Sequence, residues 1–92
     1  MNKYESVIIT KPAEESAINV EDKFSELIEK NGNLTKLENL GIRQLAYQVK
    51  GYEKGHYLIY HFESEAEFIG ELERQFRLDE NIIKFIVIKV EE

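Results

Sequence analysis

The order of hydrophobic patterns along the chain predicts an α+β fold, with a four-stranded antiparallel sheet and two helices on one of its faces. Four runs rich in β-branched and aromatic residues are typical of strands, and two segments repeat apolar residues at helical spacing. They follow one another as strand, helix, strand, strand, helix, strand. Right-handed crossovers then place both helices on the same side of the sheet, in a split β-α-β arrangement.

The first strand and the first helix are expected within residues 3–30. Val7, Ile8 and Ile9 form the centre of a strand from residue 3 to 10, and Lys11-Pro12 ends it because proline lacks a backbone donor. The helix is expected from residue 14 to 30, with Asn31-Gly32 as a left-handed stop. Its apolar face consists of Ala17, Val20, Phe24, Leu27 and Ile28.

The middle of the chain predicts a hairpin. Leu45, Tyr47 and Val49 alternate with other residues in a strand from residue 34 to 49, and Gly41 interrupts the pattern as a bulge would. Residues 50–55 are expected to form a glycine-bracketed turn, because Gly51 and Gly55 enclose it. The aromatic and β-branched run from residue 56 to 62 then predicts the third strand.

The last third of the chain predicts a helix and a strand. Ser64-Glu65-Ala66-Glu67 has the order of a capping box, so the helix is expected to begin at Ser64. Its apolar face consists of Phe68, Ile69, Leu72 and Phe76. A turn at residues 79–81 leads into a strand from residue 82 to 90. We therefore predict a single ferredoxin-like domain over residues 1–92.

Strand alternation predicts that the sheet face away from the helices is apolar. The helix side would carry Tyr4, Ser6, Ile8, Thr10, Leu58, Tyr60, Phe62, Phe85 and Val87. The other face would carry Val7, Ile9, Tyr57, Ile59, Ile86 and Ile88. An uncovered apolar face is typical of a docking surface, so we expect a protein partner there. A strand slipped by one residue, or a loop folded over the face, would remove this surface.

The distribution of charge limits the classes of partner. The net charge is −6, but residues 31–54 hold four basic and two acidic residues, whereas both flanking segments are acidic. A protein that binds duplex nucleic acid mainly through phosphates needs a denser cluster of cations. Any nucleic-acid contact is therefore expected to be local and to require a second protein.

No set of residues predicts catalysis, a cofactor or a metal site. His56 and His61 lie five apart on one strand and so point to opposite faces, with no acid at metal-ligand spacing from either. The absence of cysteine excludes thiolate chemistry and disulfides. The loop at residues 11–14 lacks the arginine and glycine with which acylphosphatases of similar element order hold a phosphate. We expect a binding protein and not an enzyme.

RNA-recognition-motif domains share this element order and stack bases on aromatic residues of the first and third strands. Residues 54–61 begin like the third-strand motif, but Tyr57, Leu58 and His61 replace the residues expected there. The first strand offers no outward ring. Base stacking on Tyr57 stays open as an alternative, although an aromatic face that docks a protein is favoured.

The sequence also indicates a compartment. No apolar run approaches the ~20 residues that a transmembrane helix needs. Residues 1–5 lead directly into a strand pattern instead of a signal-peptide core. Together with the absence of cysteine, these features predict a cytosolic protein.

Four segments resemble the family of the sixth protein of the bacterial small ribosomal subunit. The most specific is residues 41–50, Gly-Ile-Arg-Gln-Leu-Ala-Tyr-Gln-Val-Lys, which is similar to the family signature Gly-x-basic-x-Leu-Ala-Tyr-x-Ile-Lys. Lys3-Tyr4-Glu5, Gly55-His56-Tyr57 and residues 76–84 resemble three further family segments. The resemblance covers nearly the whole chain in the family's order.

A few positions depart from the family pattern. Val49 stands where isoleucine is usual and Gln48 where proline is frequent. Asn2-Lys3 offers less basic charge than members with two basic residues near Tyr4, so a thinner RNA footprint is expected. The chain ends at Glu91-Glu92, where many members continue into a tail, and no tail function is expected.

The resemblance implies a structural constituent of the small ribosomal subunit, located in the cytoplasm. It implies that the chain binds the central domain of the subunit's RNA as a heterodimer with the small basic ribosomal protein eighteen. By position, it implies RNA contacts from Lys3, Tyr4, Arg43, Lys50, Lys54 and Lys84. The isolated chain is expected to be a monomer, and Leu45 and Tyr47 are expected to pack in the core or an interface. The alternative is a ferredoxin-like regulatory or self-association module that binds no RNA.

Overall fold

A computed structural model describes residues 1–90 of the chain, and all structural statements below concern these residues. The expected order of elements is confirmed. The elements are β1 (Asn2–Thr10), α1 (Glu14–Asn31), β2 (Gly32–Val49), β3 (Tyr52–Ser64), α2 (Ala66–Leu78) and β4 (Ile82–Val90). The expectation that the chain ends at Glu91-Glu92 without a tail concerns residues outside those described.

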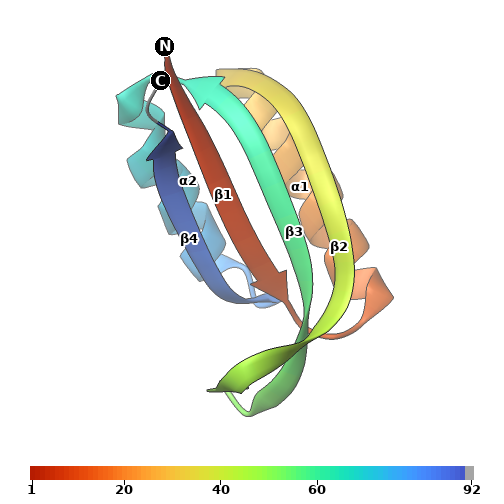
Figure 1. Ribbon diagram of the computed structural model, residues 1–92. Helices are drawn as coiled ribbons and strands as arrows, with labels where there is room; N and C mark the ends of the chain where they lie inside the picture. The colour runs from red at the N-terminus through yellow and green to blue at the C-terminus, as the bar shows by residue number, and fades with distance from the viewer. Residues whose placement is uncertain (91–92) are drawn as a thin grey trace.

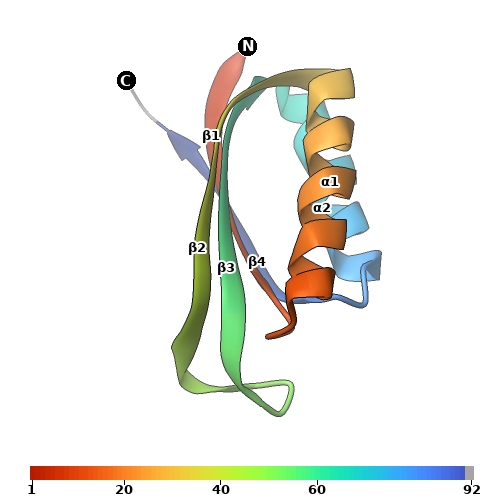
Figure 2. The same ribbon diagram turned by 90° about the vertical axis from the view of Figure 1, so that its right-hand side faces the viewer.

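The four strands form one antiparallel sheet in the order β2-β3-β1-β4. Figure 1 shows the sheet in front of both helices, and Figure 2 shows the two layers from the side, with α1 and α2 on the same face. The predicted α+β, ferredoxin-like fold is therefore confirmed. The tip of the β2–β3 hairpin extends beyond the helices at one end of the molecule, opposite the end where both termini lie (Figures 1 and 2).

The main core lies between the sheet and the helices, as strand alternation predicts. Tyr4, Ser6 and Ile8 of β1 stand opposite Phe62, Tyr60 and Leu58 of β3, and all six side chains are buried. The helices contribute Val20, Phe24, Ile28, Phe68, Leu72 and Phe76. This register excludes the one-residue slip that would have turned these side chains to the other face.

Tyr60 joins the central strand β3 to helix α1. Its side chain is fully buried, and its hydroxyl lies 3.2 Å from the carbonyl oxygen of Val20 and 3.0 Å from that of Glu21, to which it donates. Burial disfavours the charged phenolate and raises the pKa of the Tyr60 hydroxyl. The buried hydroxyl thus finds its hydrogen-bond acceptors on the backbone of α1, the helix against which the ring packs.

The end of α1 and the start of α2 differ from the sequence prediction. Gly32 has a φ of −174° and begins β2, so it is not the expected left-handed stop, and the Asn31 side chain donates to the carbonyl oxygen of Leu27 at 2.9 Å. Ser64 is buried at the end of β3, and its hydroxyl lies 3.1 Å from the carbonyl oxygen of Glu65. Helix α2 begins at Ala66 without a side-chain cap, so the predicted capping box is wrong.

The hairpin strands are longer and their turn is shorter than expected. Pairing continues to Gln44 opposite Lys54 and resumes with Val49 opposite Tyr52, so residues 52–55 belong to β3 and not to a turn. The connection consists of Lys50 and Gly51, with φ values of 52° and 85°. Positive φ at both central residues is the pattern of a type I′ turn, which suits the twist of paired strands.

Removing a core side chain is expected to lower the free energy of unfolding substantially. Leu72→Ala or Phe24→Ala would leave a cavity at a fully buried position, at a cost of about 2–5 kcal/mol. Ile18→Ala is the matched control, because Ile18 lies on the exposed side of α1, and its cost should stay within about 0.5 kcal/mol. Urea denaturation followed by circular dichroism measures all three, and equal losses for Leu72 and Ile18 would contradict the assigned core.

Tyr60 is expected to make the folded state sensitive to alkali. Its pKa is raised in the folded state, so the unfolded chain loses this proton first as pH rises. The stability that protonated Tyr60 contributes to the folded state is complete below the unfolded pKa of about 10 and is lost progressively above it. We expect the free energy of unfolding to fall above this pH, and to fall less steeply in Tyr60→Phe. An identical slope in the variant would show that Tyr60 does not carry the effect.

Candidate functional site

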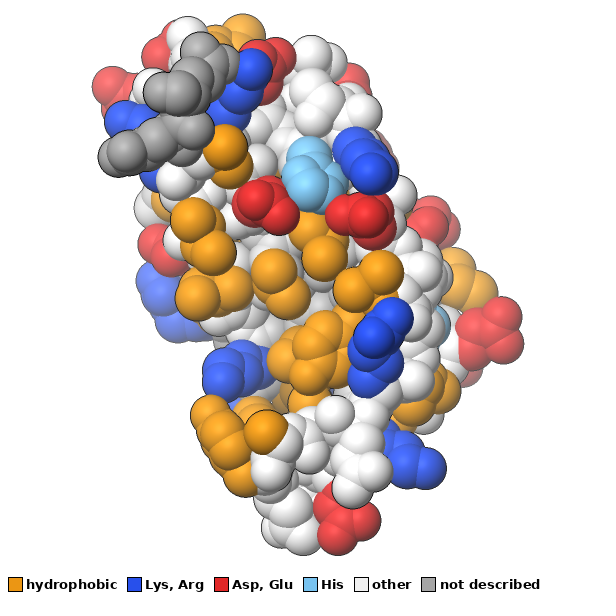
Figure 3. All heavy atoms as spheres, in the orientation of Figure 1, with side chains coloured by type: hydrophobic (Ala, Val, Ile, Leu, Met, Phe, Trp, Pro, Cys, Tyr) orange, Lys and Arg blue, Asp and Glu red, His pale blue; other side chains and the backbone are white. Residues whose placement is uncertain are grey.

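The sheet face opposite the helices presents a continuous apolar surface. Val7 on β1 stands between Ile59 on β3 and Ile86 on β4, and Tyr57 and Ile88 extend the surface along their strands. Ile86 and Ile88 are 52% and 48% exposed, although both are large aliphatic side chains. Figure 3 shows the apolar side chains gathered in the middle of this face. We call Val7, Tyr57, Ile59, Ile86 and Ile88 the open face.

Ile9 is the exception among the residues expected on this surface. It is 8% exposed and packs in a second cluster with Leu45 of the hairpin and Ile83 of β4. A side chain at position 55 would clash with the Ile9 methyl group, so Gly55 permits the close approach. The expectation that Ile9 faces a partner is therefore wrong, because the hairpin covers this corner of the sheet.

An acidic group of residues borders the open face. His61 lies between two carboxylates, with its Nε2 at 2.7 Å from Glu38 and its Nδ1 at 3.9 Å from Glu5. The hydrogen bond from His61 lowers the pKa of the Glu38 carboxyl, so the carboxylate form is favoured. Figure 3 shows the histidine flanked by acidic side chains directly beside the apolar surface.

His56 has a different role on the helix side of the sheet. The Asn39 side-chain oxygen lies 2.6 Å from His56 Nε2 and accepts the backbone N–H of Gly41 at 3.0 Å. Gly41 has a φ of 77°, and the β2–β3 register shifts between Asn39 and Gly41. The two histidines thus lie on opposite faces, as expected, and His56 supports the predicted bulge that directs the far half of β2.

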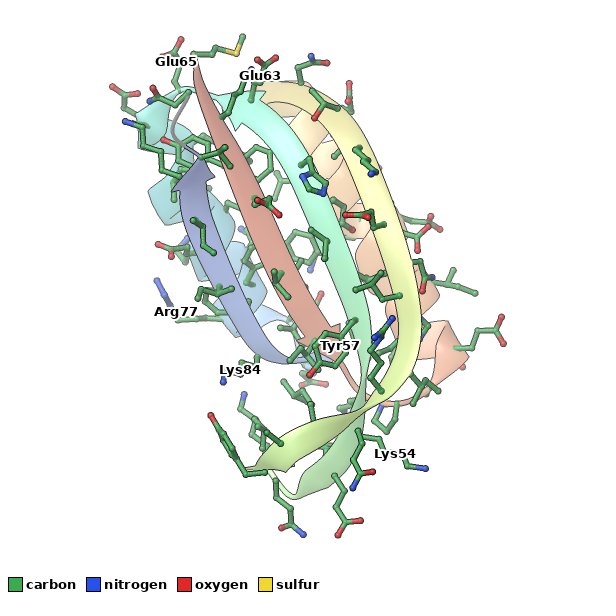
Figure 4. The ribbon with its side chains drawn as sticks, viewed as in Figure 1. Lys54, Tyr57, Glu63, Glu65, Arg77 and Lys84 are labelled. Carbon is green, nitrogen blue, oxygen red and sulfur yellow. The ribbon has the colours of Figure 1, made fainter. Side chains whose placement is uncertain are left out.

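Most of the cations expected at an RNA contact lie toward the hairpin end. Arg43 follows the bulge on β2, Lys50 is in the turn, Lys54 is on β3 and Lys84 is near the start of β4. Figure 4 shows Lys54 and Lys84 toward this end, whereas Glu63 and Glu65 lie at the end with the termini. Lys3 lies at the terminal end, opposite Glu63 and Val90 in the sheet register.

Tyr4 is placed differently from the other residues of the expected RNA set. Its side chain is only 7% exposed and stacks on Phe62, with ring centroids 5.6 Å apart. The ring faces the helices, where it belongs to the main core. Its position supports a packing role and leaves little of the side chain for RNA.

The basic side chains differ in whether they pair with carboxylates. Lys23, Lys30, Lys36 and Arg74 form ion pairs with carboxylates. Within residues 1–90, no such pair is formed by Lys11, Arg43, Lys50, Lys54, Arg77, Lys84 or Lys89. Most of these unpaired cations lie toward the hairpin end, although the chain has a net charge of −6 and Lys89 lies near the opposite end of β4.

Sequence reasoning missed two residues in this region. Arg77 of α2 joins Lys50 and Lys84 around one hollow, although the three lie on separate elements. Tyr47 was expected to pack in the core or an interface, and its 65% exposed side chain excludes the core. The alternation of β2 gave no signal for Tyr47, because the strand twists away from the sheet beyond the bulge (Figure 1).

The described residues offer two candidate binding surfaces. Among residues 1–90, no cluster of three histidine or acidic side chains is placed to hold a metal ion. Neither α1 nor α2 is long and apolar enough to cross a membrane. An apolar open face bordered by carboxylates, together with a separate cationic end, defines a domain that binds other macromolecules.

Comparison with known proteins identifies the family. Residues 3–89 match the model of the family "Ribosomal protein S6". The chain is 39% identical over 95 residues to the small ribosomal subunit protein bS6 of Nitratiruptor, covering 99% of this chain and 73% of the relative. The corresponding protein of Campylobacter jejuni is 37% identical over 94 residues, covering 99% and 75%. This chain belongs to the ribosomal protein S6 family.

A solved structure confirms the relationship. The crystal structure of 30S ribosomal protein S6 from Thermotoga maritima is 29% identical and superposes with a TM-score of 0.91, covering 97% of this chain and 87% of that one. Family membership makes the chain a component of the small subunit of the cytoplasmic ribosome and not an enzyme.

Proposed function

We propose that this chain binds the central domain of small-subunit ribosomal RNA cooperatively, as a heterodimer with the small basic ribosomal protein eighteen. The observation that carries the proposal is the open face. It exposes Ile86 and Ile88 next to the Glu5, His61 and Glu38 group. A surface that combines exposed apolar side chains with carboxylates fits a protein partner that is apolar at its centre and basic at its margin.

The charge of the chain explains why two proteins would be needed. Phosphate contacts dominate the affinity of proteins for RNA, and each requires an accessible cation. Here most of the cations without an ion pair lie toward one end, while the chain as a whole has a net charge of −6. A basic partner on the open face would reduce the repulsion and add phosphate contacts of its own. The heterodimer should therefore bind RNA much more tightly than this chain alone.

The cooperative mechanism is tested by measuring RNA affinity with and without the partner. Fluorescence anisotropy of a labelled central-domain RNA, at about physiological salt, should show tight binding only when this chain and protein eighteen are both present. Ile86→Lys should abolish the cooperativity because it places a cation in the centre of the open face. Ile18→Lys is the matched control, since Ile18 is similarly exposed but lies on α1.

Two outcomes would contradict the proposal. An RNA affinity that does not change on addition of protein eighteen would refute cooperative binding. A concentration-dependent dimer of the isolated chain in sedimentation, lost in Ile86→Lys, would instead support the self-association alternative. We expect a monomer at all concentrations.

Arg43 is expected to contribute to RNA binding but not to folding. It is exposed, and its Nε lies 3.4 Å from the carbonyl oxygen of Leu40 on the same strand. Arg43→Ala should lower RNA affinity of the heterodimer and reduce the slope of log K against log salt by about one. Its free energy of unfolding should change by no more than about 0.5 kcal/mol. Arg43→Lys, which keeps the charge, should retain the slope, and a variant Arg43→Ala that unfolds would show a structural arginine instead.

A further inference from the structure

Tyr47 is a large aromatic side chain exposed beside a cation. It lies on the distal half of β2, and 65% of its surface is accessible. The Lys84 ammonium donates to the Tyr47 hydroxyl at 3.1 Å and lies 5.3 Å from the ring centroid. The ammonium is thus closer to the hydroxyl than to the centre of the ring, and it fixes the ring while leaving aromatic surface open to a ligand.

Lys84 also borders the hollow that lies next to this ring. The hollow has a volume of about 280 Å³ and is formed where the hairpin turn, the end of α2 and the start of β4 meet. Its walls are Lys50, Phe76, Arg77, Ile82, Ile83, Lys84 and Phe85. The hairpin turn thus brings Lys50 to two cations of the α2–β4 region, Arg77 and Lys84, and apolar side chains complete the wall.

The cations around the hollow are available to an anion. The Arg77 guanidinium lies 5.9 Å from the Phe85 ring centroid, a contact with a neutral group that leaves its charge uncompensated. Lys84 contacts the neutral Tyr47, and no carboxylate of residues 1–90 forms an ion pair with Lys50, Arg77 or Lys84. A nearby acid on the hairpin, Glu53, accepts from the Gln48 side chain at 3.3 Å. Figure 4 shows Arg77 and Lys84 along the same side of the molecule.

We propose that Tyr47 and this hollow form a site for one unpaired nucleotide of RNA, with its base on the Tyr47 ring and its phosphodiester among Lys50, Arg77 and Lys84. An exposed ring can stack only on a base whose face is free, which excludes a base inside a duplex. A ring beside a cationic hollow is the combination that single-stranded nucleic acids require. The inference rests on the proposed RNA-binding function and adds a defined nucleotide contact to it.

The first test uses the complete heterodimer and the central-domain RNA. Tyr47→Ala should weaken binding roughly tenfold, because it removes the stacking surface, whereas Tyr47→Phe keeps the ring and should stay close to wild type. Arg77→Gln and Lys84→Gln should each reduce the salt slope of log K by about one. Lys89→Gln is the charge-matched control, because Lys89 lies near the opposite end of β4. Thermal unfolding of each variant establishes that it folds.

The outcomes separate this inference from the proposed function. If the wild-type heterodimer binds RNA cooperatively but Tyr47→Ala and Arg77→Gln bind equally well, the nucleotide site is wrong and the proposed function stands. If the wild-type heterodimer does not bind cooperatively, the proposed function is wrong. The site is then judged by the second experiment, which requires no partner.

The second experiment follows the isolated chain by NMR during titration with single-stranded oligouridylate, and separately with inorganic phosphate. A nucleotide site predicts shifts of both the Tyr47 ring and the Arg77 side chain with the oligonucleotide. It also predicts that Tyr47→Ala weakens this binding. Equal shifts of Arg77 with phosphate alone and with the oligonucleotide, without any change at Tyr47, would indicate a simple anion site and overturn the nucleotide proposal.

Discussion

The packing of both helices on one face of the sheet is the constraint on which the rest of the structure depends. Tyr60 fixes this arrangement, because its buried ring lies on the central strand β3 and its hydroxyl donates to backbone carbonyls of α1. Right-handed crossovers leave no helix of residues 1–90 on the second face, of which the hairpin covers only one corner. As a direct result of the topology, Ile86 is exposed on this face and its neighbours Val7 and Ile59 are only partly buried. The connectivity of this domain therefore leaves an apolar face on which the proposed partner could dock.

The second surface, the cationic end, depends on the backbone geometry of the hairpin. The Asn39 side chain supports the bulge at Gly41, and Gly55 allows Ile9 to approach the β3 backbone closely. These local features hold the distal hairpin against the corner of the sheet, where Leu45 of the hairpin packs with Ile9 and Ile83. They also bring the turn to the side where α2 ends and β4 begins. The cationic end is thus assembled by backbone geometry and not by a run of basic residues in the sequence.

Much of the fold, and part of the site, could be predicted from the sequence. Period-two alternation placed Val7, Ile59 and Ile86 correctly, because one face of each strand is buried and fixes the register. Alternation also placed Ile9 on the outward face, but it could not indicate that the hairpin covers this residue. The resemblance suggested Tyr4 as an RNA contact, whereas the alternation placed it correctly in the core.

Ser64 matched a capping box, but pairing with Asn2 and Gly32 kept it in β3. The gathering of Lys50, Arg77 and Lys84 depends on the tertiary fold, so no sequence spacing indicates it.

The bulge of β2 has a further consequence for the free protein. β2 is 18 residues long and lies at the edge of the sheet, so its outer backbone groups lack a strand partner. A long, regular edge strand is a template for pairing with another copy of the chain and hence for aggregation. The register shifts after Leu34, Asn39 and Gln44 interrupt this template, and the positive φ of Gly41 bends it further. The irregularities that position the hairpin thereby also disfavour edge-to-edge assembly of newly made chains.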